Sequence, residues 1–445
     1  MTIAKEVKGG HEAEGRPVEF SIEKGRIFAD LRIGADVAGT VRLRANEGIS
    51  SPGVKLHGAG FIVTPAEARA LGLGTVPGLE AHIREYRNGR DLTATPRRAM
   101  VIDLFGLTEA EVRTRFPAVY QHVLDKVKPE RDHNNRETYR KNWWVHGEPR
   151  RDMRPALSGL SRFIATVETT KHRNFQFLGQ ETLPDNMLIA IGTDDSAALA
   201  VLSSRFHEIW ALKAGGTLED RPRYNKSLCF DPFPFPAPNE AQKARLNSLG
   251  EQLDAHRKAQ LAAHPKLTLT GMYNVLEKLR AGQRIDGKDR EIYDQGLIGI
   301  LRDLHDQIDR DVAVAYGWPA DLTDDEVLHR LVDLNRERAA EEARGLVRWL
   351  RPDYQNPQGR AVAAKADQGA LDIGPTETTA KTPWPKSMPD QIAAVRAALH
   401  DMGEATPDQI ARRFHRVQSR SVQPLLEILT ALGQAHLTDA GRFAS

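Results

Sequence analysis

The stretch from Tyr139 to Phe177 carries the side chains whose chemistry is clearest from the sequence. Between Arg140 and Asn174 there are eight Lys or Arg residues and three acidic residues, a net charge of +5, whereas the whole chain has only +2. Trp, His and Asn side chains stand among these charges. Lys and Arg bind phosphates, and Arg and Asn also read base edges, so the stretch suits a nucleic-acid surface. The alternative is a solvated basic face beside a core anchored by Trp.

Seven residues are the first candidates for nucleic-acid contact: Arg150, Arg151, Arg154, Lys171, His172, Arg173 and Asn174. Arg can fork onto guanine and Asn onto adenine, while Lys mainly meets phosphate. Because most contacts in such interfaces position the nucleic-acid backbone, we expect only a minority to touch bases. Three further candidates are Lys141, Arg223 and Lys226. We expect Trp143 and Trp144 to anchor the loop in the core rather than to stack on bases.

Length and composition predict a soluble globular protein of about two to four domains. The chain has 445 residues, and 27% of them are charged. No apolar run approaches the length of a membrane span, and the N-terminus lacks the apolar part of a secretory signal. The one cysteine, Cys229, excludes an internal disulfide and a zinc site built from cysteines. We therefore expect a cytoplasmic protein with no membrane partner.

Two groups of acids and histidines could be imagined as metal ligands. The first is Glu67, Glu80 and His82, and the second is Asp303, His305 and Asp309. The second group has spacings of two and four residues on a predicted helix, so its members do not share one tight face. A solvated helix surface explains these residues better, and we predict no metal site.

The first half of the sequence predicts mixed structure. Thr64 followed by Pro65 and Glu67 is a helix-capping pattern. Alternating or continuous apolar runs predict short strands at 17–22, 26–33, 100–105, 163–168 and 187–192. Apolar spacing predicts helices at 108–115, 116–128 and 196–211.

The second half predicts mainly helices. They are expected at 241–263, 271–281, 289–316 and 324–350, and together suggest a bundle. A segment rich in Pro, Gly, Thr, Ala and Gln then predicts a linker. The final order, helices at 389–400, 406–415 and 419–432 with a hairpin at 434–444, is typical of a winged helix. Arg416 and Arg420 stand at the turn into its third helix, where such modules meet a groove. The third helix itself is apolar, so contact with another protein, or simple helix packing, explains its composition equally well.

A series of short motifs resembles the target-recognition domain of MmeI-like proteins. These are single-chain type II restriction–modification proteins, related to class I DNA adenine methyltransferases. The matching runs follow one another in order: Leu56 to Phe61, Ile83 to Leu92, Val101 to Asp103, Phe116 to Tyr120, Val127 to Arg131, Trp143 and Trp144, Gly147 to Arg150, Leu202 to Trp210, and Phe233 to Pro236. The helices after Ala237 resemble the C-terminal helical domain of that family.

The resemblance implies an upstream domain that binds S-adenosylmethionine and methylates a flipped adenine. That chemistry needs a glycine-rich loop after a strand and an Asn/Asp-Pro-Pro-aromatic turn. We find neither: Gly58-Ala-Gly60 reads as a turn, and Asp231-Pro-Phe-Pro has the wrong order and matches the closing motif of the recognition domain. The nuclease pattern of an Asp followed by Glu-x-Lys is not found either. We expect no catalytic residue and no cofactor in this chain, and S-adenosylmethionine in a missing catalytic domain.

The sequence thus predicts an α+β protein, a mixed target-recognition domain followed by a helical bundle and a winged-helix-like module. The predicted segments are a connector, the recognition domain, the helical domain, a linker and the module, at 1–50, 51–238, 239–351, 352–384 and 385–445. The predicted function is recognition of duplex DNA for an adenine-N6 methyltransferase, with a separate catalytic chain as partner. The alternatives are a non-functional fragment of such an enzyme and a winged-helix DNA-binding regulator.

Overall fold

The computed structural model describes residues 2–6, 20–24, 34–218, 221–359, 384–385, 388–411, 413–414, 419–431, 435–438 and 442–444. The chain divides into two compact units between Ala364 and Lys365, within the segment predicted as a linker. The segments predicted as recognition and helical domains both lie in the first unit. β1 (Thr2–Glu6) and β2 (Phe20–Lys24) form an antiparallel hairpin, and the predicted strand 26–33 lies outside the described residues.

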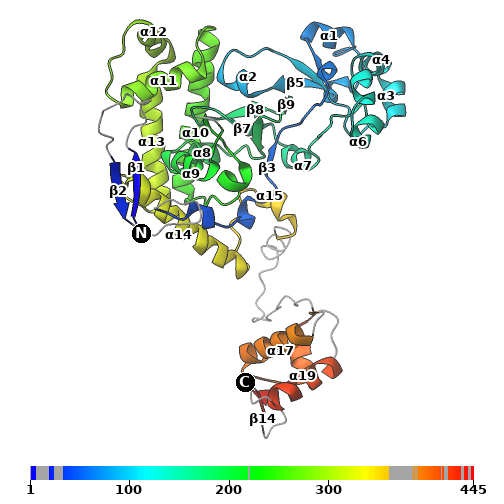
Figure 1. Cartoon of the computed structure of the whole chain (residues 1–445), viewed down its shortest axis with the longest axis vertical. Coiled ribbons are helices and arrows are strands. Elements are labelled where there is room, and N and C mark those ends of the chain that lie inside the picture. Colours follow the sequence, from blue (N-terminus) through cyan, green and yellow to red (C-terminus); the bar gives the residue numbers. More distant parts are fainter. Residues whose placement is uncertain are drawn as a thin grey trace, which may run out of the picture. The chain divides into compact units, whose positions relative to one another are not determined.

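Two four-stranded sheets lie at the centre of the first unit (Figure 1). The first sheet is antiparallel, in the order β3 (Ser50–Pro52), β10 (Leu188–Ile191), β7 (Arg162–Val167) and β8 (Phe175–Gly179). The second has the order β4 (Ile62–Val63), β6 (Met100–Ile102), β5 (Ile83–Arg87) and β9 (Thr182–Pro184), and its last pair is parallel. The strands predicted around Val101, Ile164 and Ile189 are confirmed, and their apolar side chains are buried.

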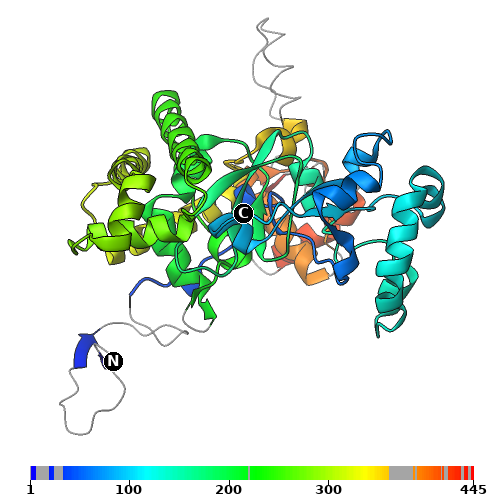
Figure 2. The same ribbon diagram turned by 90° about the horizontal axis from the view of Figure 1, so that it is seen from above.

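Most of the short helices lie on one side of the sheets, opposite the long helices, in both ribbon views (Figures 1 and 2), whereas α2 (Gly89–Thr93) lies beside α11 (Leu269–Arg280). Thr64 caps the first of them with a complete capping box, as predicted, and Thr108 caps another in the same way. The side chains of Val112, Val119 and Val123, which belong to two of these helices, are fully buried. The short helices are α1 (Pro65–Ala70), α2 (Gly89–Thr93), α3 (Glu109–Arg115), α4 (Pro117–Lys126), α5 (Lys128–Asp132), α6 (Glu137–Lys141) and α7 (Met153–Leu157).

The long helices share one apolar core on the other side of the sheets. Their order is α8 (Ser196–Leu202), α9 (Arg205–Gly215), α10 (Glu240–Ala263), α11 (Leu269–Arg280), α12 (Gly287–Gly296), α13 (Ile298–Tyr316) and α14 (Asp324–Ala343), and a short α15 (Pro352–Gln355) follows. The bundle was predicted, but the bounds of three predicted helices were wrong, namely those at 196–211, 289–316 and 324–350.

Each correction has a local cause. The predicted helix 196–211 is two helices, because Ser204 is extended and its hydroxyl donates to the Val201 carbonyl. The predicted helix 289–316 breaks at Leu297, which is left-handed with φ 46°. The helix predicted to reach residue 350 ends at Ala343, with left-handed Gly345 just beyond it. Apolar periodicity continued across all three breaks, so it did not reveal them.

The outer edge of β8 is paired with side chains of α10 instead of another strand. The Phe177 N–H donates to Asp254 Oδ1 at 3.1 Å, and Lys258 Nζ donates to the Phe177 carbonyl at 2.8 Å. Arg257 Nη1 donates to the Phe175 carbonyl at 2.8 Å. Asp254 and Arg257 are buried, so these groups have no access to water as an alternative partner. Helix α10 therefore completes the sheet and attaches the bundle to it.

The second unit has its own apolar core, which includes Val395, Leu399, Val422 and Leu426. Its order is α17 (Met388–Met402), β13 (Glu404–Ala405), α18 (Pro407–Ala411), α19 (Ser419–Ala431), β14 (His436–Leu437) and β15 (Phe443–Ala444). The strands form one antiparallel sheet in the order β13-β15-β14. The middle helix ends at Ala411 rather than at residue 415. None of the helices in the described part of the chain has the length and apolar character that a membrane crossing requires.

We predict that Asp254→Ala lowers the free energy of unfolding by about 2–3 kcal/mol, because it leaves the buried Phe177 N–H without an acceptor. Chemical denaturation followed by tryptophan fluorescence would measure the change. Gln252→Ala, on an exposed position of the same helix, is the matched control and should change stability little. Equal denaturation midpoints for the two variants would contradict the role given to Asp254.

A second prediction concerns Asp309 of α13, which accepts a hydrogen bond from the Arg205 N–H at 2.8 Å. Burial raises the pKa of this carboxyl from 3.8 to about 6. Between these values the folded state binds a proton that the unfolded state has lost, so stability falls as the pH rises through this window.

Asp309→Asn keeps the acceptor and removes the charge, so it should stabilise the fold by up to about 3 kcal/mol above the higher pKa. Denaturation at about pH 5 and about pH 8 would measure this, and the gain should be larger at the higher pH. The exposed Asp303→Asn is the control. A gain of the same size at both values would show that Asp309 is not the titrating group.

Candidate nucleic-acid interface

Three of the predicted residues lie at one end of the first sheet, which we call the gathered end. They are Arg150, Arg173 and Arg223. Here β7 and β3 end, β10 begins, and the hairpin of β11 (Thr217–Leu218) and β12 (Arg221–Pro222) lies beside them. Arg150 Nε donates to the Gly53 carbonyl at 3.0 Å, just beyond β3. Arg173 and Arg223 lie beside the last residues of β7.

Arg173 is only partly exposed, and its guanidinium is bonded within the fold. Its guanidinium donates to Thr166 Oγ1 at 3.2 Å, to the Val167 carbonyl and to the Pro222 carbonyl at 3.3 Å. It also lies over the Tyr224 ring, and burial lowers its pKa. These bonds tie β7 to the β11–β12 hairpin. Base reading by Arg173 stays a prediction, but this geometry leaves its guanidinium little freedom to reach a base.

Asn174 and Arg154 are held inside the fold as well. Asn174 is buried, and its amide donates to the His172 carbonyl at 3.4 Å. Arg154 makes two hydrogen bonds to Asp103, at 2.7 and 2.9 Å, and its Nε donates to the Pro149 carbonyl. Burial alone would raise the pKa of Asp103. His146 and Arg154 act in the opposite direction and together outweigh burial, so the pKa is lowered overall. Arg154 thereby fixes the loop after Trp143 to the end of β6.

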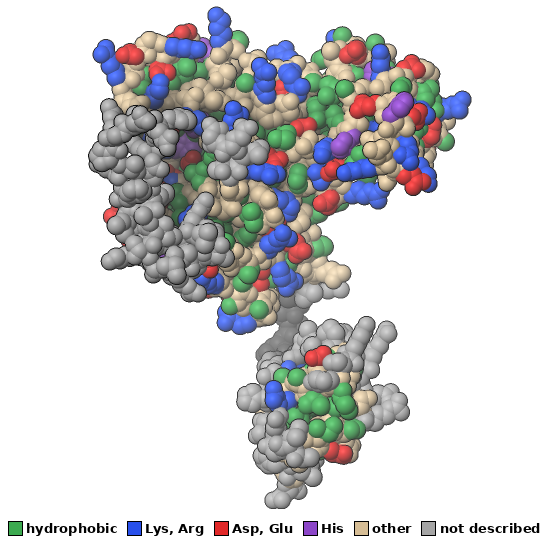
Figure 3. Space-filling view, in the orientation of Figure 1, with side chains coloured by type: hydrophobic (Ala, Val, Ile, Leu, Met, Phe, Trp, Pro, Cys, Tyr) green, Lys and Arg blue, Asp and Glu red, His purple; other side chains and the backbone are tan. Residues whose placement is uncertain are grey.

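The more exposed candidate cations form ion pairs with carboxylates. Arg150 binds Glu148 at 2.9 Å, and Arg223 binds Glu168 at 2.6 Å. The other three pairs are Lys141–Glu137 at 2.8 Å, Lys171–Glu277 at 2.7 Å and Lys226–Asp231 at 2.9 Å. In the space-filling view, Lys and Arg side chains of this unit are interleaved with Asp and Glu (Figure 3). The cations of the predicted basic segment therefore do not form a continuous positively charged surface.

Several candidates lie away from the gathered end of the sheet. Lys226 is at the opposite end, where its partner Asp231 accepts from the Ser50 hydroxyl. Arg151 is exposed and lines a cavity of about 640 Å³ beside Tyr139 and Trp144. In the second unit, Arg416 is outside the described residues, and Arg420 lies in the first turn of α19.

The two tryptophans anchor the loop, as predicted. Trp143 is 4% exposed, and Trp144 Nε1 donates to the Leu107 carbonyl at 3.0 Å. Among the described residues, no group of three or more His, Cys, Asp or Glu side chains is placed to hold a metal ion. His305, one of the imagined ligands, is buried and bonds the Tyr273 hydroxyl at 2.7 Å.

Sequence reasoning missed the residues that orient the candidate cations. Asn274 of α11 binds both Lys171 Nζ and His172 Nε2, at 3.0 and 2.8 Å. Met187 is 40% exposed at the gathered end, where its carbonyl accepts from the Glu168 N–H. Glu168 was counted as an acid inside the basic segment, a signal that could have revealed its pairing. Asn274 gave no signal, because it is about a hundred residues away in the chain.

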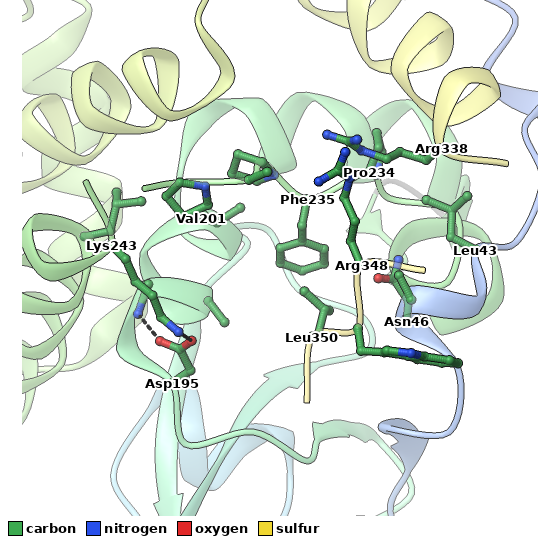
Figure 4. A pocket seen from close by; sticks show the side chains of 18 of the residues that line it. Leu43, Asn46, Asp195, Val201, Pro234, Phe235, Lys243, Arg338, Arg348 and Leu350 are labelled. Atoms are coloured by element: carbon green, nitrogen blue, oxygen red, sulfur yellow. Dashed lines mark hydrogen bonds and ion pairs between the residues drawn. The ribbon is translucent and has the colours of Figure 1, made fainter. Parts of the chain in front are cut away.

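A second concave site lies where the connector, the Phe-Pro motif and α14 meet (Figure 4). Its volume is about 330 Å³, and Phe235 and Leu350 face into it. The three cations that line it are paired: Lys243 with Asp195 at 3.3 Å, and Arg338 and Arg348 both with Glu341. None of the candidate nucleic-acid contacts lines this site.

Comparison with known proteins agrees with the fold and with the sequence motifs. Residues 51–237 match the MmeI target recognition domain. This segment is therefore similar to that domain family. The predicted resemblance to the target-recognition domain of MmeI-like proteins is confirmed.

The fold is also similar to a solved structure of the Type IIL restriction-modification enzyme MmeI in complex with DNA. The TM-score is 0.56 at 18% sequence identity, and the match covers 74% of this chain and 41% of the MmeI chain. This chain thus spans about two fifths of the length of that relative. The comparison with curated proteins gives no match.

The segment 51–237 should depend on Arg173 for its stability. We predict that Arg173→Met lowers the free energy of unfolding by about 2–4 kcal/mol, because the part-buried Val167 and Pro222 carbonyls lose a charged donor. Arg151→Ala, which changes an exposed Arg, should stay within about 0.5 kcal/mol of the parent. Chemical denaturation would compare the two. A stable Arg173→Met variant would return Arg173 to the candidates for base contact.

Proposed function

We propose that this chain recognises a specific sequence in duplex DNA, as the target-recognition part of a restriction–modification system that methylates adenine at N6. The observation that carries the proposal is the MmeI target recognition domain over residues 51–237. The likeness to the fold of MmeI, whose structure was solved in complex with DNA, supports it. In the cell, we place this activity in the cytoplasm, where DNA is accessible.

The gathered end of the first sheet is the surface that we propose for DNA. Arg150, Lys171 and Arg223 border it, with side chains 28%, 58% and 49% exposed. Each is charged and has a carboxylate partner, so binding to DNA exchanges a carboxylate for a phosphate or a base edge. Such an exchange gains less free energy than the binding of a free cation, which favours specificity over general affinity. Arg173 and Arg154 support this surface from within.

Methyl transfer requires S-adenosylmethionine and a pocket for the flipped adenine. Because we identify neither motif in this sequence, we propose that a separate catalytic domain binds the cofactor and acts with this chain. The residues described above then select the DNA site at which that domain works. In this arrangement the chain carries specificity and its partner carries catalysis.

We also propose that the second unit is a winged-helix-like module. Its elements follow the order helix, strand, helix, helix and two strands, as such a module requires. In α19, however, Val422, Leu425 and Leu426 are buried in the unit's own core. Its role in DNA binding therefore rests on Arg416 and Arg420, which remain predictions.

Selection of a random duplex pool on the purified chain tests the proposed function. We expect a short enriched sequence at near-physiological salt. Arg150→Ala should relax the choice at one base pair, at a cost of about 1–3 kcal/mol if Arg150 reads a base edge. An even loss over all sequences would make Arg150 a phosphate contact. Arg310→Ala, an exposed arginine of α13, is the control.

Weak and sequence-blind binding that disappears with salt would contradict the proposal. That result would favour a fragment that folds without serving recognition. Motif selection that survives Arg150→Ala but is lost in Arg420→Ala would instead favour the regulator that binds through its winged helix.

A further inference from the structure

The loop between β7 and β8, residues 168–174, is attached to the helical bundle. Lys171 Nζ donates to Asn274 Oδ1 at 3.0 Å and to Glu277 Oε2 at 2.7 Å. His172 Nε2 binds the same Asn274 oxygen at 2.8 Å. Asn274 and Glu277 are one turn apart on α11, so a single helix face holds two neighbouring loop residues.

The two contacts on this face differ in their exposure. His172 is only partly exposed, and it also lies against the Tyr273 ring. The Lys171–Glu277 pair is open to solvent, with side chains 58% and 60% exposed. An exposed ion pair contributes little to stability, because water and salt screen it. The loop therefore keeps its position through Asn274 and His172, while Lys171 can exchange its carboxylate partner.

The acid that neutralises Lys171 comes from outside the recognition domain. Arg150 binds Glu148 and Arg223 binds Glu168, and both of these acids belong to the recognition domain itself. Glu277 lies in the bundle, 106 residues along the chain from Lys171. The hydrogen bond from Lys171 lowers the pKa of Glu277.

We propose that Glu277 is a specificity-determining residue that competes with DNA phosphate for Lys171. The inference rests on the proposed function and adds a residue of the bundle to it. On DNA of the wrong sequence, few other contacts form, and Lys171 stays with Glu277. On the correct sequence, the remaining contacts hold the phosphate close enough to displace the carboxylate. Glu277 thus weakens non-specific binding more than specific binding.

Glu277→Gln tests this proposal, because it keeps the shape and the hydrogen bond but removes the charge. Affinity for a random duplex at low salt should rise about threefold to fivefold, the effect expected for one exposed ion pair. The slope of log affinity against log salt should steepen by about 0.9, as for one more phosphate contact. The ratio of specific to non-specific affinity should fall. Glu291→Gln, on exposed α12, is the matched control for a lost negative charge.

The double variant Lys171→Ala/Glu277→Gln separates competition from general repulsion. In the Lys171→Ala background, Glu277→Gln should change DNA affinity no more than Glu291→Gln does. An equal gain in both backgrounds would show that Glu277 only repels DNA, and would overturn the proposal. If the parent selects a motif and Glu277→Gln leaves DNA affinity unchanged, the role given to Glu277 is wrong while the proposed function stands. If the parent binds no duplex at all, the proposed function fails with it.

Discussion

The outer edge of β8 is the constraint on which the rest of the first unit depends. An edge strand exposes main-chain groups that need partners, and here Asp254, Arg257 and Lys258 of α10 supply them. The network continues into the bundle through the Tyr273 hydroxyl and His305. Because Asp254 and Arg257 are buried, separating the bundle from the sheet would break hydrogen bonds that are shielded from water. The bundle is therefore part of the recognition fold rather than an appendage to it.

This attachment also determines where the candidate interface forms. The chain leaves β7, makes the loop 168–174 and returns as β8, so fixing β8 on α10 brings the loop against α11. Asn274 then holds Lys171 and His172, while Arg173 closes the loop onto Val167 and Pro222. The loop is thus fixed from the bundle on one side and from the sheet on the other. Such a loop is preorganised, which lowers the entropic cost of the proposed binding to DNA.

Local signals in the sequence were sufficient for much of the fold. Thr64 with Glu67 predicted a helix start, and the apolar runs around Val101 and Ile189 predicted buried strands, because these patterns depend on near neighbours only. The break at Leu297 was not predictable in this way, since the apolar spacing runs through it. The motifs identified the recognition domain, whereas the partners of Arg154 and Lys171 come from 51 and 106 residues away. Pairing over such distances leaves no local pattern.

The same distances explain why a local charge count overstates a basic surface. The segment from Arg140 to Asn174 has a net charge of +5, but Asp103 and Glu277, both from outside it, neutralise two of its cations. Glu148 and Glu168 then bind Arg150 and the nearby Arg223. A surface built of such pairs attracts DNA weakly at long range and gains affinity only where the phosphates and base edges fit. Charge pairing of this kind suits the proposed function, in which most sequences have to be rejected.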